Sequence, residues 1–303
     1  YALHPFPAGN HLRFDEHYEE DLAKLQAKFK QVIDQGVRQI AILADDFWNP
    51  GGQNGLRLLN DMTEWLKEVK KEYPDMKMTI PYVPYDYMGN GSSQELQILK
   101  QAPDNVQIVM TGGRVWGEVT DNFTSTFTNN VGRGPFMWIN WPCTDNSKKH
   151  LIMGGYDTFL HPGVEPSKIQ GIMLNPMQQS EPSKVAIFGN ASYAWNIWET
   201  KEEAEEIWNA SFSFVDHNSA ISNEASDALR EMSKHMINQA MDSRVTALQE
   251  SVVLKEELNA FKEKLEAETL TAADVDAMIE EFELLQEAAK TYRASGNERS
   301  EEH

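Results

Sequence analysis

The sequence predicts an α/β fold of repeated strand–helix units, followed by a helical region. Short apolar runs alternate with helical patterns through the first 198 residues, and the runs begin at positions 1, 39, 78, 106, 136 and 169. Intervals of 28 to 39 residues between these starts are typical of repeated βα units. Continuous apolar runs are typical of parallel strands that are covered on both faces. A change in composition near residue 198 predicts the second region.

That change in composition is large. Residues 199–303 carry 10 basic and 25 acidic side chains, whereas residues 1–198 carry 17 and 22. Glycine and proline almost disappear after residue 198, and acid-rich helical patterns replace the apolar runs. We therefore predict two domains, 1–198 and 199–303.

The overall composition excludes several classes of protein. With 41% hydrophobic and 24% charged residues, the 303-residue chain has the composition of a globular protein. Its formal net charge of −20 would repel phosphate backbones, so nucleic acid is a poor candidate partner. No apolar run approaches the ~20 residues of a membrane-spanning helix. Cys143 is the single cysteine, so an intrachain disulfide is impossible.

The elements of the first region follow in order. We predict one helix that begins after Asp15 as the N-cap and ends near Gly36, a second over Leu58–Val69 and a third over Gln94–Gln101. Lys184–Phe188 is ambiguous, because its propensity favours a strand whereas Ser183 could be a helix N-cap. The predicted strands are Tyr1–Pro5, Gln39–Asp46, Met78–Pro84, Val106–Thr111, Phe136–Pro142 and Ile169–Asn175.

The second region shows three apolar stripes at helical spacing, which predict a bundle with charged outer faces. Thr271 is a candidate N-cap of the last helix. The stripes are Leu229, Met232, Met236, Ala240 and Leu248; Leu254, Leu258, Phe261 and Leu265; and Val275, Met278, Ile279, Phe282 and Leu285.

Asp45 and Asp46 are the strongest candidates for chemistry. They directly follow the apolar run Ile40–Ala44, and functional sites are built at the carboxyl ends of parallel strands. Two adjacent carboxylates repel each other, and burial raises the pKa of at least one. One neutral acid beside one ionised acid is a familiar division of labour in catalysis. A helix N-cap or an exposed loop pair is the structural alternative.

Polar and aromatic residues also follow the other predicted strands. Each of them alone has a structural explanation, because buried Trp is usually core and Asn is often a turn residue. Together, aromatic faces and polar edges are typical of a surface that binds sugar rings. The residues are Asp86 and Tyr87; Thr111–Arg114; Trp138, Asn140, Trp141 and Asp145; and Asn175–Met177.

The sequence offers no pattern for a metal or a nucleotide. His4, His11 and His17 lie close together, but their surroundings indicate loop and helix surface, and no Cys/His cluster has zinc spacing. Gly51–Gly55 lacks the Lys-Ser/Thr of a phosphate-binding loop.

The ordered set of these segments resembles glycoside hydrolase family 84, the β-N-acetylglucosaminidases that include bacterial O-GlcNAcase homologues and a clostridial "hyaluronidase" toxin. Asp216–Ser219 is similar to the opening of that family's helical domain. The other matching segments are Ala2–Pro5, Gly36–Asp46, Pro84–Tyr87, Ile108–Val115, Trp138–Pro142 with Asp145, Asn175–Met177 and Ala191–Asn196.

The resemblance implies a (β/α)8 barrel of the TIM type followed by a helical bundle. The match begins inside the third barrel strand, so the chain is expected to supply about six βα units. The first two strands would then come from a longer parent chain, from another chain or from a swapped copy in a homodimer. In a natural truncation, they would be absent altogether.

The resemblance also implies a retaining, substrate-assisted mechanism in which the substrate's own 2-acetamido oxygen forms an oxazoline. Asp45 would hold the acetamido N–H, and Asp46 would act as acid and then as base. Residues from three further strand ends would shape the acetamido pocket: Tyr87, Thr111, Val115 and Trp138. Asn140, Asp145 and Asn175 would bond sugar hydroxyls, with Asp145 on O4 and O6.

No metal or organic cofactor is needed for that reaction. The expected partner is a glycan or glycoprotein that bears terminal β-linked N-acetylglucosamine, and the resemblance favours a secreted or cell-surface location. Two alternatives stay open. The chain could be an inactive carbohydrate-binding or assembly module, or a helical-bundle interaction protein with a vestigial barrel.

Overall fold

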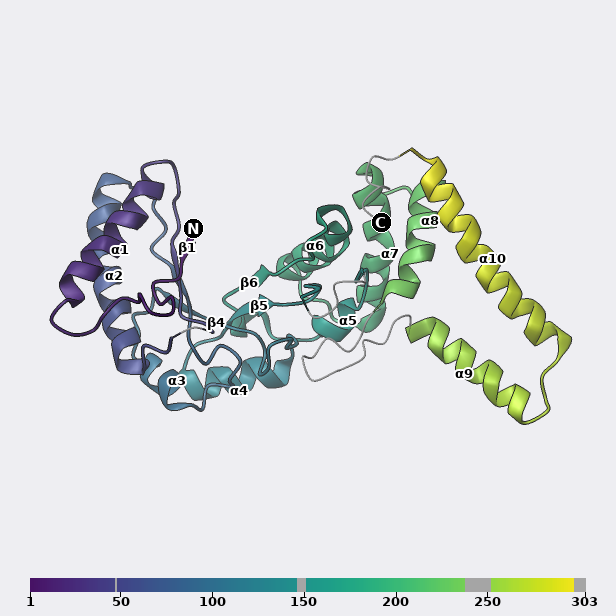
Figure 1. Cartoon of the computed structure of the whole chain (residues 1–303), viewed down its shortest axis with the longest axis horizontal. Helices are drawn as coiled ribbons and strands as arrows, with labels where there is room; N and C mark the ends of the chain where they lie inside the picture. The colour runs from purple at the N-terminus through teal and green to yellow at the C-terminus, as the bar shows by residue number, and fades with distance from the viewer. Residues whose placement is uncertain (47, 146–150, 238–251, 297–303) are drawn as a thin grey trace. The chain divides into compact units, whose positions relative to one another are not determined.

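The computed structural model describes residues 1–46, 48–145, 151–237 and 252–296 (Figure 1). Its six strands form one sheet in sequential order, and the first four neighbouring pairs are parallel. The predicted succession of βα units is therefore confirmed for the described residues. The strands are β1 (Ala2–Leu3), β2 (Ala41–Leu43), β3 (Ile80–Val83), β4 (Val106–Met110), β5 (Phe136–Ile139) and β6 (Gly171–Leu174).

The register of the strands aligns their carboxyl ends. Ile42 of β2 is paired with Tyr82 of β3, and Tyr82 is paired with Ile108 of β4. These three side chains are completely buried. Because the pairs are parallel, the residues that follow each strand emerge at the same edge of the sheet.

The chain divides into two compact units. One consists of Tyr1–Trp138 with Val164–Met173, and the other of Ile139–Gly163 with Leu174–His303. The predicted domain boundary near residue 198 stays a prediction, because these units describe compactness and not independent folding.

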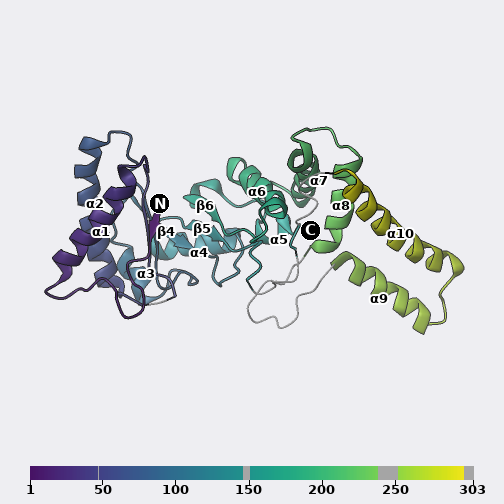
Figure 2. The same cartoon turned by 45° about the horizontal axis from the view of Figure 1, so that its top comes forward.

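Four helices cover the strands of the first unit, and each buries an apolar stripe. In α2, Leu58, Leu59 and Met62 are fully buried. Figure 2 shows α1 and α2 side by side, and the two helices touch. A short 3₁₀ turn, Pro166–Lys168, also belongs to this unit. The helices are α1 (Tyr18–Ile33), α2 (Gly52–Glu72), α3 (Gln94–Leu99) and α4 (Asp121–Val131).

The predicted start of the first helix is wrong, and the segment that the sequence left ambiguous, Lys184–Phe188, is helical. The N-cap of α1 is His17 and not Asp15, because the Asp15 carboxylate accepts the backbone N–H of His17 at 2.8 Å and closes a turn before the helix. Lys184–Phe188 is helical, but its helix α6 (Ser180–Trp195) begins before Ser183. The Ser183 hydroxyl donates to the carbonyl oxygen of Gln179 at 2.7 Å, one turn back inside the helix.

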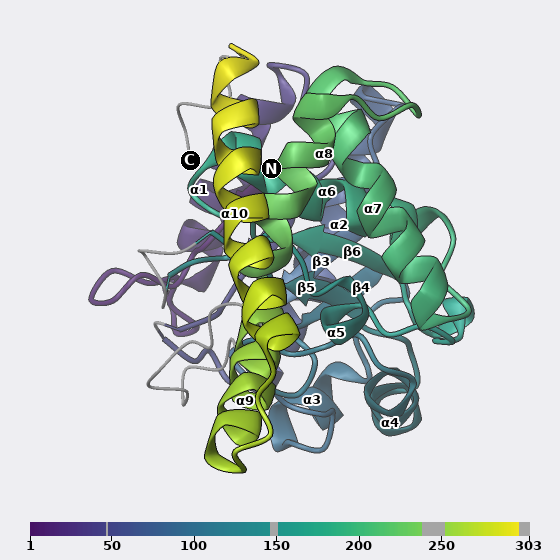
Figure 3. The ribbon, with the colours of Figure 1, turned by 90° about the vertical axis from the view of Figure 1, so that its right-hand side faces the viewer.

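The second unit is helical. Phe188 of α6 stacks on Phe214 of α7 with ring centroids 5.2 Å apart. Figure 3 shows α10 running along α8, where Ala288 and Tyr292 of α10 are buried. The remaining elements are α5 (Tyr156–Phe159), α7 (Lys201–His217), α8 (Glu224–Ser233), the 3₁₀ turn Lys234–Met236, α9 (Val252–Glu266) and α10 (Ala272–Ala294).

Thr271 is confirmed as the N-cap of α10. Its side chain accepts the backbone N–H of Asp274, and the Asp274 carboxylate accepts the backbone N–H of Thr271 at 2.9 Å. This reciprocal pair is a capping box.

The expected apolar stripes are covered only in part. Leu229 of α8 is buried, whereas Leu265 of α9 and Ile279 of α10 are 57% and 51% exposed. Ala240 and Leu248 lie outside the described residues. Within the described part of the chain, no helix combines the length and apolar composition needed to cross a membrane.

The N-cap of α4, in the first unit, gives a direct test of how that helix begins. The Thr120 hydroxyl accepts the backbone N–H of Phe123 at 3.1 Å. We expect Thr120→Ala to lower the free energy of unfolding by about 1 kcal/mol, because that N–H loses its partner. Urea unfolding measures the change, and Thr126→Ala in the same helix serves as control. Equal midpoints for the two variants would contradict the assignment.

Candidate active site

The two acids follow β2, at the edge of the sheet where the strands' carboxyl ends meet. The backbone N–H of Ala44 donates to the carbonyl oxygen of Val83 at 2.8 Å, which extends the β2–β3 pairing by one residue. Asp46 then adopts a positive φ of 62°, a backbone conformation that residues other than glycine adopt less often. Such conformations recur at active sites as well as in turns, and Asp adopts them more often than most residues.

Asp45 and Asp46 have different surroundings. The Asp45 side chain is 16% exposed, whereas Asp46 is an exposed residue. Oδ1 of Asp45 is buried and accepts no hydrogen bond from the described residues. Burial raises the pKa of Asp45, and the neighbouring Asp46 carboxylate raises it further. Oδ1 of Asp45 thus lacks a hydrogen-bond donor among the described residues, and Nε2 of His4 lies 3.8 Å from it.

Tyr87 links the ends of β2 and β3. Its hydroxyl donates to Oδ1 of Asp46 at 3.0 Å. Its ring stacks on Trp138, with centroids 5.3 Å apart and planes inclined by 30°. Burial, together with the hydrogen bond to Asp46, raises the pKa of the Tyr87 hydroxyl, which therefore stays protonated as a donor.

Thr111 supports Tyr87 from the end of β4. It is completely buried, its N–H donates to the carbonyl oxygen of Tyr87 at 2.9 Å, and its hydroxyl donates to that of Arg114 at 2.7 Å. Val115 and Trp138 pack against the buried cluster of Val83, Tyr87 and Val109. The structure thus brings five of the predicted residues together in the first unit: Asp46, Tyr87, Thr111, Val115 and Trp138.

The other predicted residues lie in the second unit. The Asn175 amide donates from Nδ2 to Oδ1 of Asn140 at 3.0 Å, and the Asn175 backbone N–H donates to the carbonyl oxygen of Ile139 at 2.8 Å. These bonds fix both amides at the ends of β5 and β6. Asp145 is exposed and lies near the Cys143 thiol, whose pKa burial raises to about 11. At neutral pH the thiol is not a nucleophile.

A cavity of about 660 Å³ lies at the same edge of the sheet. It is lined by residues that follow β2, such as Pro50 and Asn54, and by residues that follow β3, such as Tyr85 and Asp86. The first turns of α2 and α3 also line it, through residues such as Asn54 and Glu95, whereas Asp46 and Tyr87 are not among the lining residues. A volume of this size suits a small organic group.

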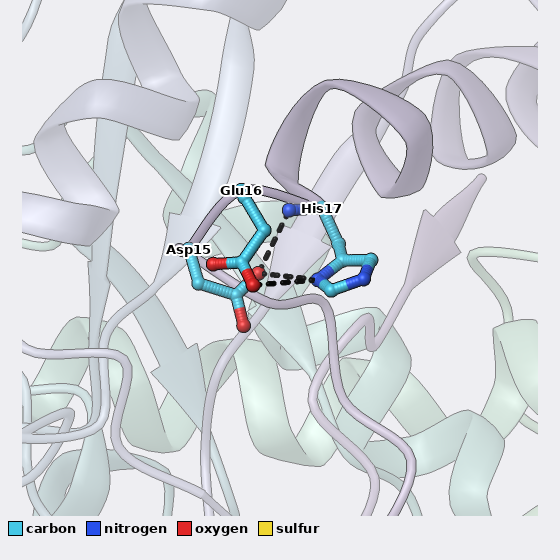
Figure 4. Close-up of side chains that lie close together, drawn as sticks. All are labelled: Asp15, Glu16 and His17. Carbon is cyan, nitrogen blue, oxygen red and sulfur yellow. Dashed lines mark hydrogen bonds and ion pairs between the residues drawn. The ribbon is translucent and has the colours of Figure 1, made fainter.

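Two groups of side chains could be mistaken for metal ligands. Figure 4 shows Asp15, Glu16 and His17, consecutive residues before α1, with His17 Nδ1 3.1 Å from Oδ1 of Asp15. They form a local contact at the surface. In the second unit, Glu231, His235 and Glu281 converge, but the Lys234 ammonium lies 2.5 Å and 2.8 Å from the two carboxylates. The ammonium pairs with both carboxylates and offsets one of their two negative charges.

Sequence reasoning missed two residues that hold the site in place. Glu95 is buried, and its two carboxylate oxygens accept the backbone N–H groups of Tyr85 and Asp86 at 3.1 and 3.0 Å. Only the fold shows that an acid in α3 reaches this loop. His4 is the second, and it stands at the end of β1 next to Asp45. The strand-end signal that singled out the other residues applied to His4 as well.

Paired acids beside two stacked aromatic rings, at the carboxyl edge of a parallel sheet with helices between the strands, place the chain in the class of α/β proteins with a site at the strand ends. The comparisons with known proteins agree. Residues 1–234 match the β-N-acetylglucosaminidase family, and the chain belongs to this family.

Solved structures of similar fold support this assignment. The structure of CpGH84D is 29% identical in sequence to this chain and superposes with a TM-score of 0.82. The match covers 99% of this chain and 49% of the CpGH84D chain. The structure of CpGH84B is 22% identical with a TM-score of 0.79, and the match covers 98% of this chain and 50% of the CpGH84B chain. A mutant O-GlcNAc hydrolase of Thermobaculum terrenum has 19% identity and a TM-score of 0.72, covering 99% and 63%. The chain thus spans about half the length of the first two.

The buried Asp45 carboxylate gives a prediction about stability. Because its pKa is raised, the folded state binds a proton more tightly than the unfolded chain does. Stability is therefore lost as the pH rises through the unfolded value of about 3.9 and then through the folded value. We expect Asp45→Asn, which cannot ionise, to gain stability relative to wild type between pH 3 and pH 7.

Urea unfolding at several pH values measures this difference. Asp104→Asn, at an exposed loop position of the same unit, is the matched control and should show no comparable gain. A difference between Asp45→Asn and wild type that is independent of pH would contradict the prediction.

Proposed function

We propose that the chain is the catalytic part of a retaining exo-β-N-acetylglucosaminidase that removes terminal β-linked N-acetylglucosamine. The observation that carries the proposal is the unequal pair of adjacent acids, one buried with a vacant acceptor and one exposed and bonded to Tyr87. Membership of the β-N-acetylglucosaminidase family supports it.

Asp45 would act on the substrate's 2-acetamido group. Its buried Oδ1 would accept the acetamido N–H, which places negative charge next to the nitrogen and makes the carbonyl oxygen a better nucleophile. That oxygen would attack the anomeric carbon and form an oxazoline, while the bond to the leaving oxygen breaks. The acetamido N–H proton would pass to Asp45 as the ring closes. Water would then attack the anomeric carbon from the face that the leaving group left, Asp45 would return the proton to nitrogen as the oxazoline opens, and the configuration would be retained.

Asp46 would serve as the general acid and base. It is exposed, so a leaving oxygen and a water molecule can reach it, and the Tyr87 hydroxyl donates a hydrogen bond to it. In the first step it would give a proton to the leaving oxygen. In the second it would take a proton from the attacking water, which returns it to its starting state.

The remaining predicted residues would bind the sugar. Tyr87, Val115 and Trp138 would enclose the acetamido methyl, and Thr111 would act through Tyr87 because its own hydroxyl is buried against the main chain. Asn140 and Asn175, held by their mutual hydrogen bond, would bond sugar hydroxyls together with Asp145.

The finer view of the fold is also a proposal. The sequential strand order and the likeness to CpGH84D support a TIM-type barrel to which this chain contributes six units, followed by a helical bundle. A GlcNAc-bearing glycan or glycoprotein is the proposed substrate. Completion of the barrel by a second chain or in a homodimer stays a prediction.

The roles of the two acids can be separated by the leaving group. We expect Asp46→Asn to reduce kcat by about 100-fold or more for an alkyl β-N-acetylglucosaminide, and much less for a dinitrophenyl glycoside, whose leaving oxygen needs no proton. Asp45→Asn should reduce both by similar factors. Steady-state hydrolysis measures these effects, with Asp104→Asn as control. Equal losses for the two leaving groups in Asp46→Asn would exclude its role as acid.

Substitution of the substrate tests participation of the acetamido oxygen. Fluorine on the acetyl group withdraws electrons from that oxygen, so kcat/KM should fall steeply from acetyl to trifluoroacetyl. Product analysis by NMR should show the β-anomer first. A flat series or an initial α-anomer would contradict substrate assistance. A chain that binds N-acetylglucosamine without hydrolysing any of these glycosides would be a carbohydrate-binding module.

A further inference from the structure

His4 is the nearest side chain to Asp45 that the proposed reaction does not use. It directly follows β1, the strand that pairs with β2. Its Nε2 lies 2.7 Å from the main-chain carbonyl oxygen of Asp45, and its Nδ1 lies 3.3 Å from the backbone nitrogen of Phe6. The side chain is 19% exposed.

These two contacts determine the tautomer of the ring. A carbonyl oxygen only accepts a hydrogen bond, so Nε2 must carry the proton. A backbone N–H only donates, so Nδ1 must present its lone pair. The direction of the His4 ring is therefore set at both nitrogens, and Nε2 also lies 3.8 Å from Oδ1 of Asp45.

From this geometry we infer that His4 is a positioning residue for Asp45, holding its main chain through the Nε2–H donor. The carbonyl that His4 binds belongs to the residue immediately before the strained Asp46. Rotation of that peptide would move the Asp45 carboxylate, and with it the buried Oδ1 that has no hydrogen-bond donor.

The segment that follows β1 also contacts the chain beyond Asp46. Trp48 stacks on His11 with ring centroids 3.9 Å apart and planes inclined by 14°. Phe6, which is completely buried, and Phe14 lie 5.8 Å and 6.4 Å from the Trp48 ring. The residues that follow β1 thus contact Asp45 before the positive-φ residue and the Trp48 side chain after it.

This inference rests on the proposed function, in which Asp45 orients the acetamido group. Misplacement of a catalytic group by about 1 Å costs on the order of 100-fold in rate. His4 does not need to touch the substrate for this effect, because it acts through the main chain of Asp45.

Two variants separate the hydrogen bond from the packing of the ring. His4→Gln keeps a donor nitrogen at similar reach, whereas His4→Leu keeps bulk and removes the donor. We expect His4→Leu to lower kcat by about 10- to 100-fold with a smaller change in KM, and His4→Gln to restore most of the loss. His17→Leu, at the surface start of α1, is the matched control and should leave kcat unchanged.

A second measurement needs no activity. Nitrogen-15 NMR of the full chain, with His4 assigned from the His4→Gln spectrum, shows which ring nitrogen carries the proton. We expect the proton on Nε2. We also expect this ring N–H to exchange faster with water in Asp46→Pro, because that substitution disturbs the loop.

The outcomes are distinct. An Nδ1–H tautomer, or equal kcat in His4→Leu and His17→Leu, would overturn the inference, as would equal losses in His4→Leu and His4→Gln. A wild-type chain without glycosidase activity would overturn the proposed function instead, and the tautomer of His4 would still test the hydrogen bond to Asp45.

Discussion

The register between β2 and β3 is the constraint on which the site in the first unit depends. Pairing of Ile42 with Tyr82 places the chain beyond each strand so that the Tyr87 hydroxyl reaches Asp46 at 3.0 Å. A slip of one residue would turn every side chain of the strand to the opposite face. The complete burial of Ile42 and Tyr82 makes such a slip costly.

Two neighbouring residues of the same type acquire different properties from this arrangement. Asp45 is withdrawn from water and keeps an oxygen without a hydrogen-bond donor, whereas Asp46 stands in solvent with a fixed donor from Tyr87. Both conditions are unfavourable for folding, since one buries a carboxylate and the other strains the backbone. The buried aromatic and aliphatic residues around them stabilise the fold enough to hold these groups in place.

Much of the fold could be predicted because periodic patterns are local. The apolar stripe of α2 and the strand of β4 were clear from spacing alone, and Thr271 has the side chain that an N-cap needs. The start of α1 was wrong because Asp15 satisfies a turn two residues before the helix. The stripes of α9 and α10 have helical spacing, yet spacing does not reveal whether a partner covers them.

The sequence by itself determined which residues stand at the strand ends, because strand and helix periods place Asp45, Asp46 and Tyr87 just beyond apolar runs. Their environments were decided only by the tertiary structure. Burial of one carboxylate, the contact of Glu95 with the Tyr85–Asp86 backbone and the hydrogen bond from His4 to Asp45 join residues 9 to 41 positions apart. Such contacts depend on strand register and helix packing, which no local pattern encodes.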